Sequence, residues 1–277
     1  MKTFPELHQG SVQWLEARAG LVTASEAKQL LTDKLAIRKP GSEMPRTLLA
    51  TKLAEKWLGP LPSFGSWAAE QGNVLEQSAF DCFAFEHDAR IEKIGFITKT
   101  RPCDTCGGSG WNHKQIGEGC GSEREACESC AGTGDFDVRA GCSPDGMLPD
   151  YGVEIKSLQP VHHIKALLDG DLPEEFAAQV HFSMWVTGLT QWKFFAYSRR
   201  LPHLLITVLR DDGVQGTIQE AMDSFLDTFD LEWLRLCEKN GGPPPERKPF
   251  VPSSPDDPRN HLFEGLPGAR DEVGFIP

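Results

Sequence analysis

Two carboxylates and a lysine lie close together in the middle of the chain, at Asp145, Glu154 and Lys156. Residues two apart on a strand share a face, so a strand over 152–156 points Glu154 and Lys156 the same way. A turn at 149–152 folds Asp145 back beside them. Two carboxylates can hold a hard divalent ion, and a lysine can orient a water or stabilise charge at a phosphate. The pattern therefore predicts metal-assisted phosphodiester hydrolysis, with a surface hairpin bearing a Glu–Lys pair as the alternative.

Five of the eight cysteines fall between Cys103 and Cys130, in a chain whose first residues show no export signal. Such clustering favours a metal site over a disulfide framework. Four of them form two C-x-x-C-x-G-x-G knuckles, Cys103 with Cys106 and Cys127 with Cys130. The glycines permit tight turns that aim backbone amides at sulfur, so four thiolates are expected to bind one structural Zn²⁺ tetrahedrally.

Two further metal-ligating residues lie between the knuckles, at His113 and Cys120. They are interpreted as alternate ligands that the site does not need, because four cysteines already complete a structural zinc site. The knuckles resemble those of the DnaJ-type chaperone zinc domain.

An anion site is indicated near the N-terminus. Thr23 and Glu26 form a capping box, which places Ser25 in the first turn of a helix. Free backbone N–H groups and the helix dipole favour an anion there, and Arg18 can reach it with a bidentate guanidinium. An ordinary cap beside a surface arginine is the alternative.

Composition sets the broad class. The chain has 277 residues with 39 % hydrophobic and 25 % charged residues, which indicates a soluble globular protein of one domain, or of one domain with an appendage. Its net charge of −12 argues mildly against a nucleic-acid partner, although clustered metal-binding carboxylates contribute to that charge. No apolar run is long enough to span a bilayer, so no membrane partner and a cytoplasmic location are expected.

The elements that must position these residues are predicted from apolar periodicity and turn residues. Helices are expected over residues 14–31 (interrupted at Gly20), 45–58, 67–87, 161–168, 173–187 and 214–239. Strands are expected over residues 90–98, 136–142, 147–156 (as a hairpin), 191–198 and 203–209. Five tryptophans are predicted to be core residues: Trp14, Trp57, Trp67, Trp185 and Trp192.

The fold class indicated is α/β, with a central mixed sheet that carries the two carboxylates and the lysine between flanking helices. Residues 101–135 lack periodicity and are predicted to be an insertion between two neighbouring strands. The core is then 1–100 with 136–240. The proline-rich tail at 241–277 is predicted to be disordered.

Five motifs occur in an order that is itself informative. They are Arg18 to Glu26, Gly72 to Glu76, Cys142 to Gly146, Val153 to Lys156 and Ala178 to Thr187. Together they resemble the phage-lambda-exonuclease branch (viral recombinase, or alkaline exonuclease) of the PD-(D/E)XK nucleases. The resemblance implies the restriction-endonuclease-like core and covers the chain from about residue 14 to 209, the insertion excluded.

The resemblance also implies roles for the central residues. Asp145 and Glu154 would bind Mg²⁺, or Mn²⁺ in its place, with the carbonyl of Ile155 as a further oxygen. Lys156 would assist the nucleophilic water. Glu76 would bring another carboxylate to the metals.

Two more roles follow from the same resemblance. Gln179 would orient water or substrate, while Arg18 and Ser25 would hold the terminal 5′-phosphate. Without it, Glu76 would be a solvated helix carboxylate and Gln179 a polar neighbour of a packing stripe.

The function implied is a Mg²⁺-dependent 5′-to-3′ exonuclease on linear double-stranded DNA that releases mononucleotides and leaves 3′ single-stranded tails. The partners implied are DNA ends, a single-strand annealing protein and two further copies of the chain in a ring-shaped trimer. A phage-encoded enzyme would act in the host cytoplasm. The alternatives are an endonuclease or 3′-directed enzyme on this core, a non-catalytic zinc-dependent module that binds DNA ends or a partner, and a chaperone-like protein.

Overall fold

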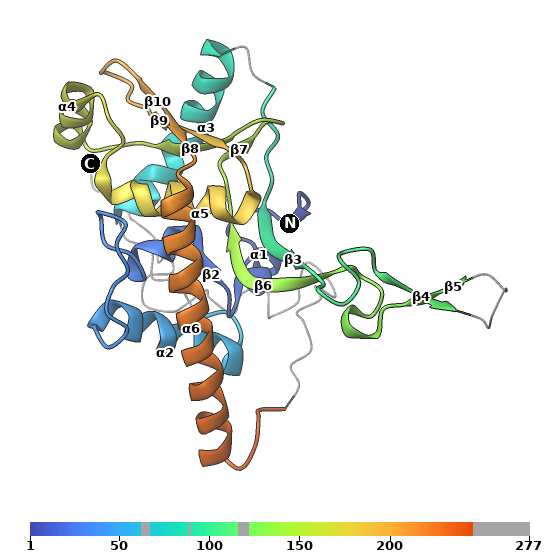
Figure 1. Ribbon diagram of the computed structural model, residues 1–277. Helices are drawn as coiled ribbons and strands as arrows, with labels where there is room; N and C mark the ends of the chain where they lie inside the picture. The colour runs from blue at the N-terminus through green and yellow to red at the C-terminus, as the bar shows by residue number, and fades with distance from the viewer. Residues whose placement is uncertain (62–66, 88–89, 116–121, 246–277) are drawn as a thin grey trace, which may run out of the picture.

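A computed structural model describes residues 1–61, 67–87, 90–115 and 122–245 of the chain (Figure 1). Within these ranges, side chains are described except at residues 67–76, 113–115 and 122–123. Cys120 and tail residues 246–277 lie outside the described residues, as does the side chain of His113.

Two four-stranded sheets form the body of the molecule. The first has the order β1-β3-β6-β2 and is made of β1 (Lys2–Phe4), β3 (Phe96–Pro102), β6 (Asp135–Cys142) and β2 (Val22–Thr23). The second has the order β10-β9-β8-β7 and is made of β10 (Leu204–Leu209), β9 (Gln191–Ala196), β8 (Gly152–Lys156) and β7 (Gly146–Met147). Each contains one parallel pair, β2 with β6 and β8 with β9, so both sheets are mixed. The predicted mixed sheet flanked by helices is therefore present, in two parts.

Helix α5 (Glu174–Thr187) packs against both sheets and lies across the centre of the view (Figure 1). Every residue from Val180 to Val186 is buried, which is what an apolar pattern on nearly all sides of a helix produces. The helix ends at Gly188, as the sequence predicts. Because α5 touches both sheets, its side chains can reach groups on either.

The opposite face of the second sheet is covered by α3 (Trp67–Glu86). Ala79 and Phe83 pack there against Val153 and Ile155 of β8. Since side chains alternate along a strand, Glu154 and Lys156 project from the other face, toward α5.

The remaining helices surround these layers. They are α1 (Val12–Arg18), the 3₁₀ helix η1 (Ala24–Gln29), α2 (Glu43–Leu58), α4 (Pro160–Asp169) and α6 (Asp212–Lys239). Buried positions of α6 run from Gln215 to Phe229, and its last turns extend beyond the body (Figure 1). None of the described helices is long and apolar enough to cross a membrane.

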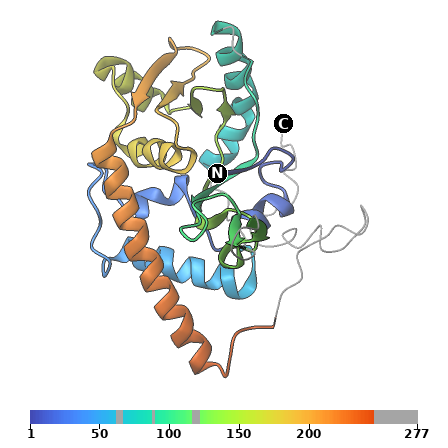
Figure 2. The same cartoon turned by 45° about the vertical axis from the view of Figure 1, so that its right-hand side comes forward.

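Residues between β3 and β6 form an arm that projects from the body (Figures 1 and 2). It consists of β4 (Trp111–Gln115) and β5 (Ser122–Ala126), which pair antiparallel, and the 3₁₀ helix η2 (Glu128–Cys130). The sequence shows no periodicity here and did not predict the two short strands.

Two predicted elements have different bounds in the structure. The strand expected from residue 90 starts at Phe96, because Glu92 forms only an isolated bridge to Met147 of the other sheet. The second half of the helix expected over 14–31 is a two-residue strand followed by the six-residue η1. Pairing with β6 makes Val22 and Thr23 a strand, and Leu31, where the helix was expected to end, forms a bridge to Ile37.

Candidate active site

The hairpin of β7 and β8 brings Asp145 beside β8, as predicted. Gly146 pairs with Val153, and the N–H of Asp145 donates to the Val153 carbonyl at 3.1 Å. The Ile155 N–H donates to Asp145 Oδ2 at 2.6 Å. One carboxylate oxygen of Asp145 is thus fixed against the backbone between Glu154 and Lys156.

Glu154 is buried with 2 % of its surface exposed, on the face of β8 that α5 covers. Its Oε1 accepts a hydrogen bond from Gln179 Nε2 at 2.6 Å and forms an ion pair with Lys156 Nζ. A buried carboxylate needs such partners to offset the loss of water. Gln179 from α5 and Lys156 from the same strand supply them.

The Ile155 carbonyl faces the same edge of β8 as its N–H, because both groups of one strand residue point the same way. That edge is the one where Asp145 lies. The carbonyl of Lys156 instead accepts from Tyr197 N at 2.8 Å, on the β9 side. Backbone and carboxylate oxygens therefore gather at the Asp145 edge.

Glu76 falls within α3, in the part whose side chains are not described. Its proposed contribution of a carboxylate lies outside the described residues. The side chain of Trp67, which is predicted to be a core residue, also lies outside the described residues.

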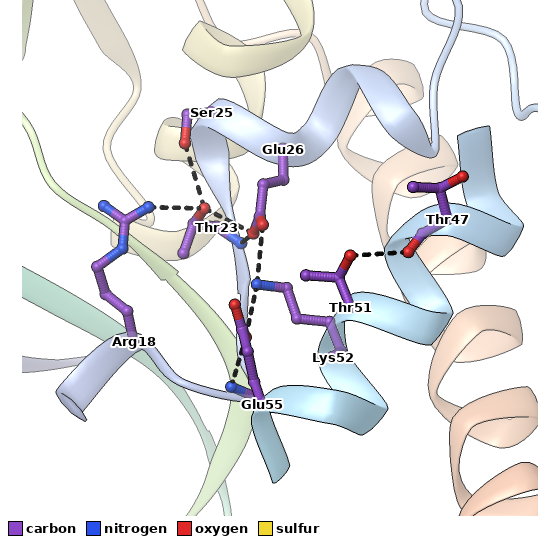
Figure 3. Close-up of polar contacts among 9 residues, drawn as sticks. Arg18, Thr23, Ser25, Glu26, Thr47, Thr51, Lys52 and Glu55 are labelled. Carbon is purple, nitrogen blue, oxygen red and sulfur yellow. Dashed lines mark hydrogen bonds and ion pairs between the residues drawn. The ribbon is translucent and has the colours of Figure 1, made fainter. Parts of the chain in front are cut away.

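The N-terminal residues predicted to bind an anion also lie together, as Figure 3 shows. Arg18 Nη2 donates to Thr23 Oγ1 at 3.2 Å, and Thr23 Oγ1 is 3.2 Å from Ser25 Oγ. The Arg18 guanidinium stacks 4.0 Å from the centre of the Trp14 ring. Burial lowers the pKa of Arg18 from its ordinary value, opposed by the carboxylates of Glu26 and Glu55; an arginine stays charged under such shifts.

The helix that contains Ser25 differs from the one predicted to bind an anion. Ser25 lies in a six-residue 3₁₀ helix rather than in the first turn of an α-helix. A helix this short has little dipole, so the cationic side chain of Arg18 and the hydroxyls of Thr23 and Ser25 remain as the anion-binding groups.

An ion-pair network around the buried Lys52 lies next to this cluster (Figure 3). Lys52 of α2 is 2 % exposed, and its Nζ lies 2.8 Å from Glu26 Oε1 and 3.0 Å from Glu55 Oε2. Glu26 Oε2 accepts from Thr23 N at 3.0 Å and from Thr23 Oγ1 at 2.8 Å. Glu55 Oε2 accepts from Gly20 N at 2.8 Å. Lys52 thus neutralises the two carboxylates that fix the backbone on either side of Leu21 and Val22.

A single pocket of about 150 Å³ joins the two groups of residues. It is lined by Gln9, Trp14, Arg18, Thr23, Ala24, Ser25, Ser143, Asp145, Glu154, Lys156 and Gln179. A neighbouring hollow of about 360 Å³ shares Gln9 and Asp145 with it. The chain therefore brings the predicted anion-binding and carboxylate residues, Glu76 aside, to one cavity with an open approach.

The sequence reasoning did not assign some residues that line the pocket or support its lining. Trp14 is predicted to be core, but it is half-buried and forms a wall of the pocket, with Nε1 donating to Gly95 O at 2.9 Å and Ser143 Oγ at 3.0 Å. Thr23 is predicted only as a cap. No local sequence pattern predicts that Lys52 is buried, because a lysine in an amphipathic helix usually lies at the surface. Trp185 and Trp192 are buried as predicted, and Trp57 is half-buried against Trp233, with ring centroids 5.6 Å apart.

The four knuckle cysteines converge in the arm. Their sulfurs all lie within 4.8 Å of one another, with Cys103 to Cys127 at 3.9 Å and Cys106 to Cys130 at 3.8 Å. Zinc–sulfur bonds of about 2.3 Å at tetrahedral angles put sulfurs about 3.8 Å apart. The donor set and its spacing fit a tetrahedral zinc ion.

The two knuckles are related by reciprocal backbone contacts. Gly110 N donates to Cys106 Sγ at 3.3 Å, and Gly134 N donates to Cys130 Sγ at 3.2 Å. Both glycines have positive φ, +76° and +83°, and a Cβ on either would lie about 2.4–2.5 Å from the carbonyl of a glycine in the other knuckle. Although burial raises it, the pKa of Cys106 falls to about 6 because of the Gly110 N–H and the neighbouring thiols. Thiolate is the form that binds metal.

Comparison with known proteins agrees with this fold. The crystal structure of LHK-Exo in complex with dAMP has a TM-score of 0.62 at 22 % identity, over 82 % of this chain and 97 % of that chain. The crystal structure of an alkaline exonuclease (LHK-Exo) from Laribacter hongkongensis has a TM-score of 0.61 at 22 % identity, with the same coverage. The predicted fold class, an α/β core of the alkaline exonuclease type, is confirmed.

The sequence adds a family match to the likeness in fold. Residues 128–190 match the YqaJ-like viral recombinase domain, a segment that contains Asp145, Glu154, Lys156 and Gln179. The predicted resemblance to the viral recombinase branch is thereby confirmed, and segment and fold together support a DNA nuclease. No curated protein is significantly similar to the chain in sequence.

Proposed function

We propose that this chain is a divalent-metal-dependent exonuclease that digests one strand of linear duplex DNA from its 5′ end. It releases mononucleotides and leaves 3′ single-stranded tails. The observation that carries the proposal is the shared pocket, in which a half-buried arginine and two hydroxyls face the carboxylates and lysine of β8 and its hairpin. LHK-Exo, which has this fold, was crystallised with dAMP, a nucleoside monophosphate.

The residues at the Asp145 edge of β8 suit a hard cation. Asp145 and Glu154, with the carbonyl of Ile155, would hold Mg²⁺ or Mn²⁺, and Glu76 would add a carboxylate from α3. A divalent ion bound there lowers the pKa of a water and neutralises charge on the phosphate oxygens.

Two side chains of the chain, Lys156 and Gln179, act near the phosphate. Lys156, held at Glu154, orients the attacking water and stabilises negative charge on the phosphate. Gln179 fixes Glu154 from α5 and positions water or substrate at the edge of the site. The water oxygen bonds to phosphorus as the P–O3′ bond breaks, and the departing 3′ oxygen takes up a proton.

The direction of digestion is set by residues on the other side of the pocket. Arg18 can bind the terminal 5′-phosphate with two parallel hydrogen bonds, with Ser25 donating a third. Cleavage of P–O3′ leaves a new 5′-phosphate on the shortened strand. Each cycle therefore regenerates the group that Arg18 and Ser25 recognise, which favours repeated cleavage in one direction.

The four cysteines of the arm would hold a structural zinc ion, with residues 101–135 as an insertion in a core of 1–100 and 136–240. Zinc there fixes two turns that have little apolar core of their own. A trimer and a single-strand annealing protein complete the proposal as partners. Sedimentation analysis of the purified chain tests the trimer.

The experiment uses linear duplex DNA labelled at one 5′ end. Labelled mononucleotide is expected to appear first with Mg²⁺, to be absent with EDTA and to appear far more slowly in Lys156→Ala. A matched change, Lys165→Ala on α4, removes a lysine outside the pocket and should leave the rate unchanged. Internal cuts, or release from the 3′ end first, would replace the 5′-exonuclease proposal by another mode on this core.

A further inference from the structure

A second group of soft and borderline metal ligands lies at the end of α3, away from both the pocket and the arm. It consists of Cys82 and Glu86 on α3 and His203 just before β10, whose ligand atoms lie within 4.8 Å of one another. Cys82 and Glu86 are four residues apart, so they share one face of the helix. We propose that these three side chains form a zinc-binding site.

The hydrogen bonds of His203 show that a cation is required between these groups. Nε2 lies 3.2 Å from the Ser198 carbonyl, an acceptor, so Nε2 carries the proton. In the neutral ring Nδ1 then has a lone pair, and that lone pair faces Glu86 Oε1 at 2.9 Å. Two acceptors at this distance repel unless a second proton or a metal ion lies between them.

The third side chain of the group is a thiol, which is a zinc ligand when deprotonated. Cys82 Sγ lies 3.5 Å from the same Nδ1 and 3.9 Å from Nε2, so the sulfur lies beside the imidazole ring. Binding of a zinc ion on the Nδ1 lone pair would require the Cys82 side chain to turn toward that side of the ring. Carboxylate, imidazole and thiolate are all zinc ligands, and a hydrogen bond from the second ring nitrogen to a carbonyl is the usual way in which a ligating histidine is oriented.

The histidine is held in place by the surrounding structure. Its ring stacks on Tyr197 with centroids 5.1 Å apart. The preceding carbonyl, of Pro202, lies 2.9 Å from Nε2 of the buried His163 on α4. A histidine that is already held in place loses little conformational entropy on binding a metal ion.

Burial and Glu86 raise the pKa of the Cys82 thiol to about 11, so without a metal the thiol keeps its proton. Binding of zinc would release that proton and pair the thiolate with the ion. The Glu86 side chain is 39 % exposed, which leaves room for water as a fourth ligand. The bound ion would fasten the end of α3 to the second sheet and so steady the helix that carries Glu76.

The test is a count of zinc bound per full-length chain, by equilibrium dialysis against Zn²⁺ and elemental analysis. Cys82→Ala and His203→Phe are each expected to bind one zinc fewer than the unmodified chain; phenylalanine keeps a ring against Tyr197. Cys237→Ala, on α6, removes a thiol outside both cysteine clusters and should leave the count unchanged. Matched far-ultraviolet circular dichroism confirms that the variants are folded.

Cobalt distinguishes the thiolate ligand from carboxylate sites. With Co²⁺ in place of Zn²⁺, the absorption from thiolate-to-cobalt charge transfer is expected to be smaller in Cys82→Ala than in Cys237→Ala. Equal zinc counts and equal cobalt spectra in the three variants would overturn the proposal and leave a protonated His203 as the cation. The exonuclease assay is a separate readout, because none of the three substituted residues lines the pocket.

Discussion

The arm takes its four cysteines from two copies of one short pattern, whereas the pocket takes its side chains from segments spread between Gln9 and Gln179. In the arm, each ligand pair comes with the glycine whose N–H faces its sulfur. In the pocket, Glu154 depends on Gln179 of another element, and Arg18 depends on Thr23 and, through Glu26, on Lys52. A site built locally can fold around its ion; a site built from distant segments must be held by the rest of the fold.

The largest effect expected is loss of structure in the arm without its ligands. Structural zinc contributes about 10–16 kcal/mol of binding free energy to small domains, so Cys106→Ala should unfold the knuckles. Hydrogen exchange should show fast exchange at Gly110 and Gly134, with β8 and α5 still protected. Loss of protection in α5 as well would show that arm and core fold as one unit.

The next largest effect is expected from the loss of a carboxylate in the pocket. Glu154→Gln keeps the shape of the side chain but removes a charge next to Lys156, so kcat is expected to fall about 10²- to 10⁴-fold. Steady-state nuclease kinetics measure it, and thermal unfolding checks that the fold is kept. Glu238→Gln, an exposed carboxylate on α6, is the control. An unchanged kcat in Glu154→Gln would remove Glu154 from the chemistry.

A third prediction concerns Lys52, whose ion pairs support the residues around Arg18. Lys52→Met leaves the half-buried carboxylates of Glu26 and Glu55 without their shared cation, which should cost about 2–4 kcal/mol of unfolding free energy. Denaturant unfolding measures this. Lys56→Met, one turn later on α2, removes an exposed lysine and should cost less than about 1 kcal/mol. Equal losses in both variants would contradict the proposed role of Lys52.

The smallest effect concerns the strand that leads from the arm to the pocket. Arg139 of β6 holds Asp230 of α6 by two hydrogen bonds of 2.7 Å, which lower the pKa of Asp230. The pair is exposed, so Asp230→Asn should cost about 0.3–1 kcal/mol. Because the folded pKa is depressed, this stability is present above the ordinary pKa of the carboxylate and is lost as pH falls through the folded value. Unfolding free energies of the two proteins should therefore converge in acid; a constant difference at all pH values would argue against the ion pair.

Sequence reasoning succeeded where the signal was local. The knuckles, the hairpin that returns Asp145 to β8 and the bounds of α5 all follow from patterns a few residues long. It failed where tertiary contacts decide: pairing with β6 made Val22 and Thr23 a strand, and Trp14 lines the pocket with Arg18 stacked on it. Lys52 and the cluster of Cys82 with His203 join residues far apart in the chain, so neither was visible before the fold.

The central claim is that one pocket holds an end-binding half and a catalytic half. The direct measurement is the ratio of digestion rates on duplexes with a 5′-phosphate and with a 5′-hydroxyl, in the unmodified chain, Arg18→Gln and Lys156→Ala. The ratio is expected to favour phosphate in the unmodified chain, to approach one in Arg18→Gln, and to persist in the residual activity of Lys156→Ala. A ratio that Arg18→Gln leaves unchanged would contradict the claim.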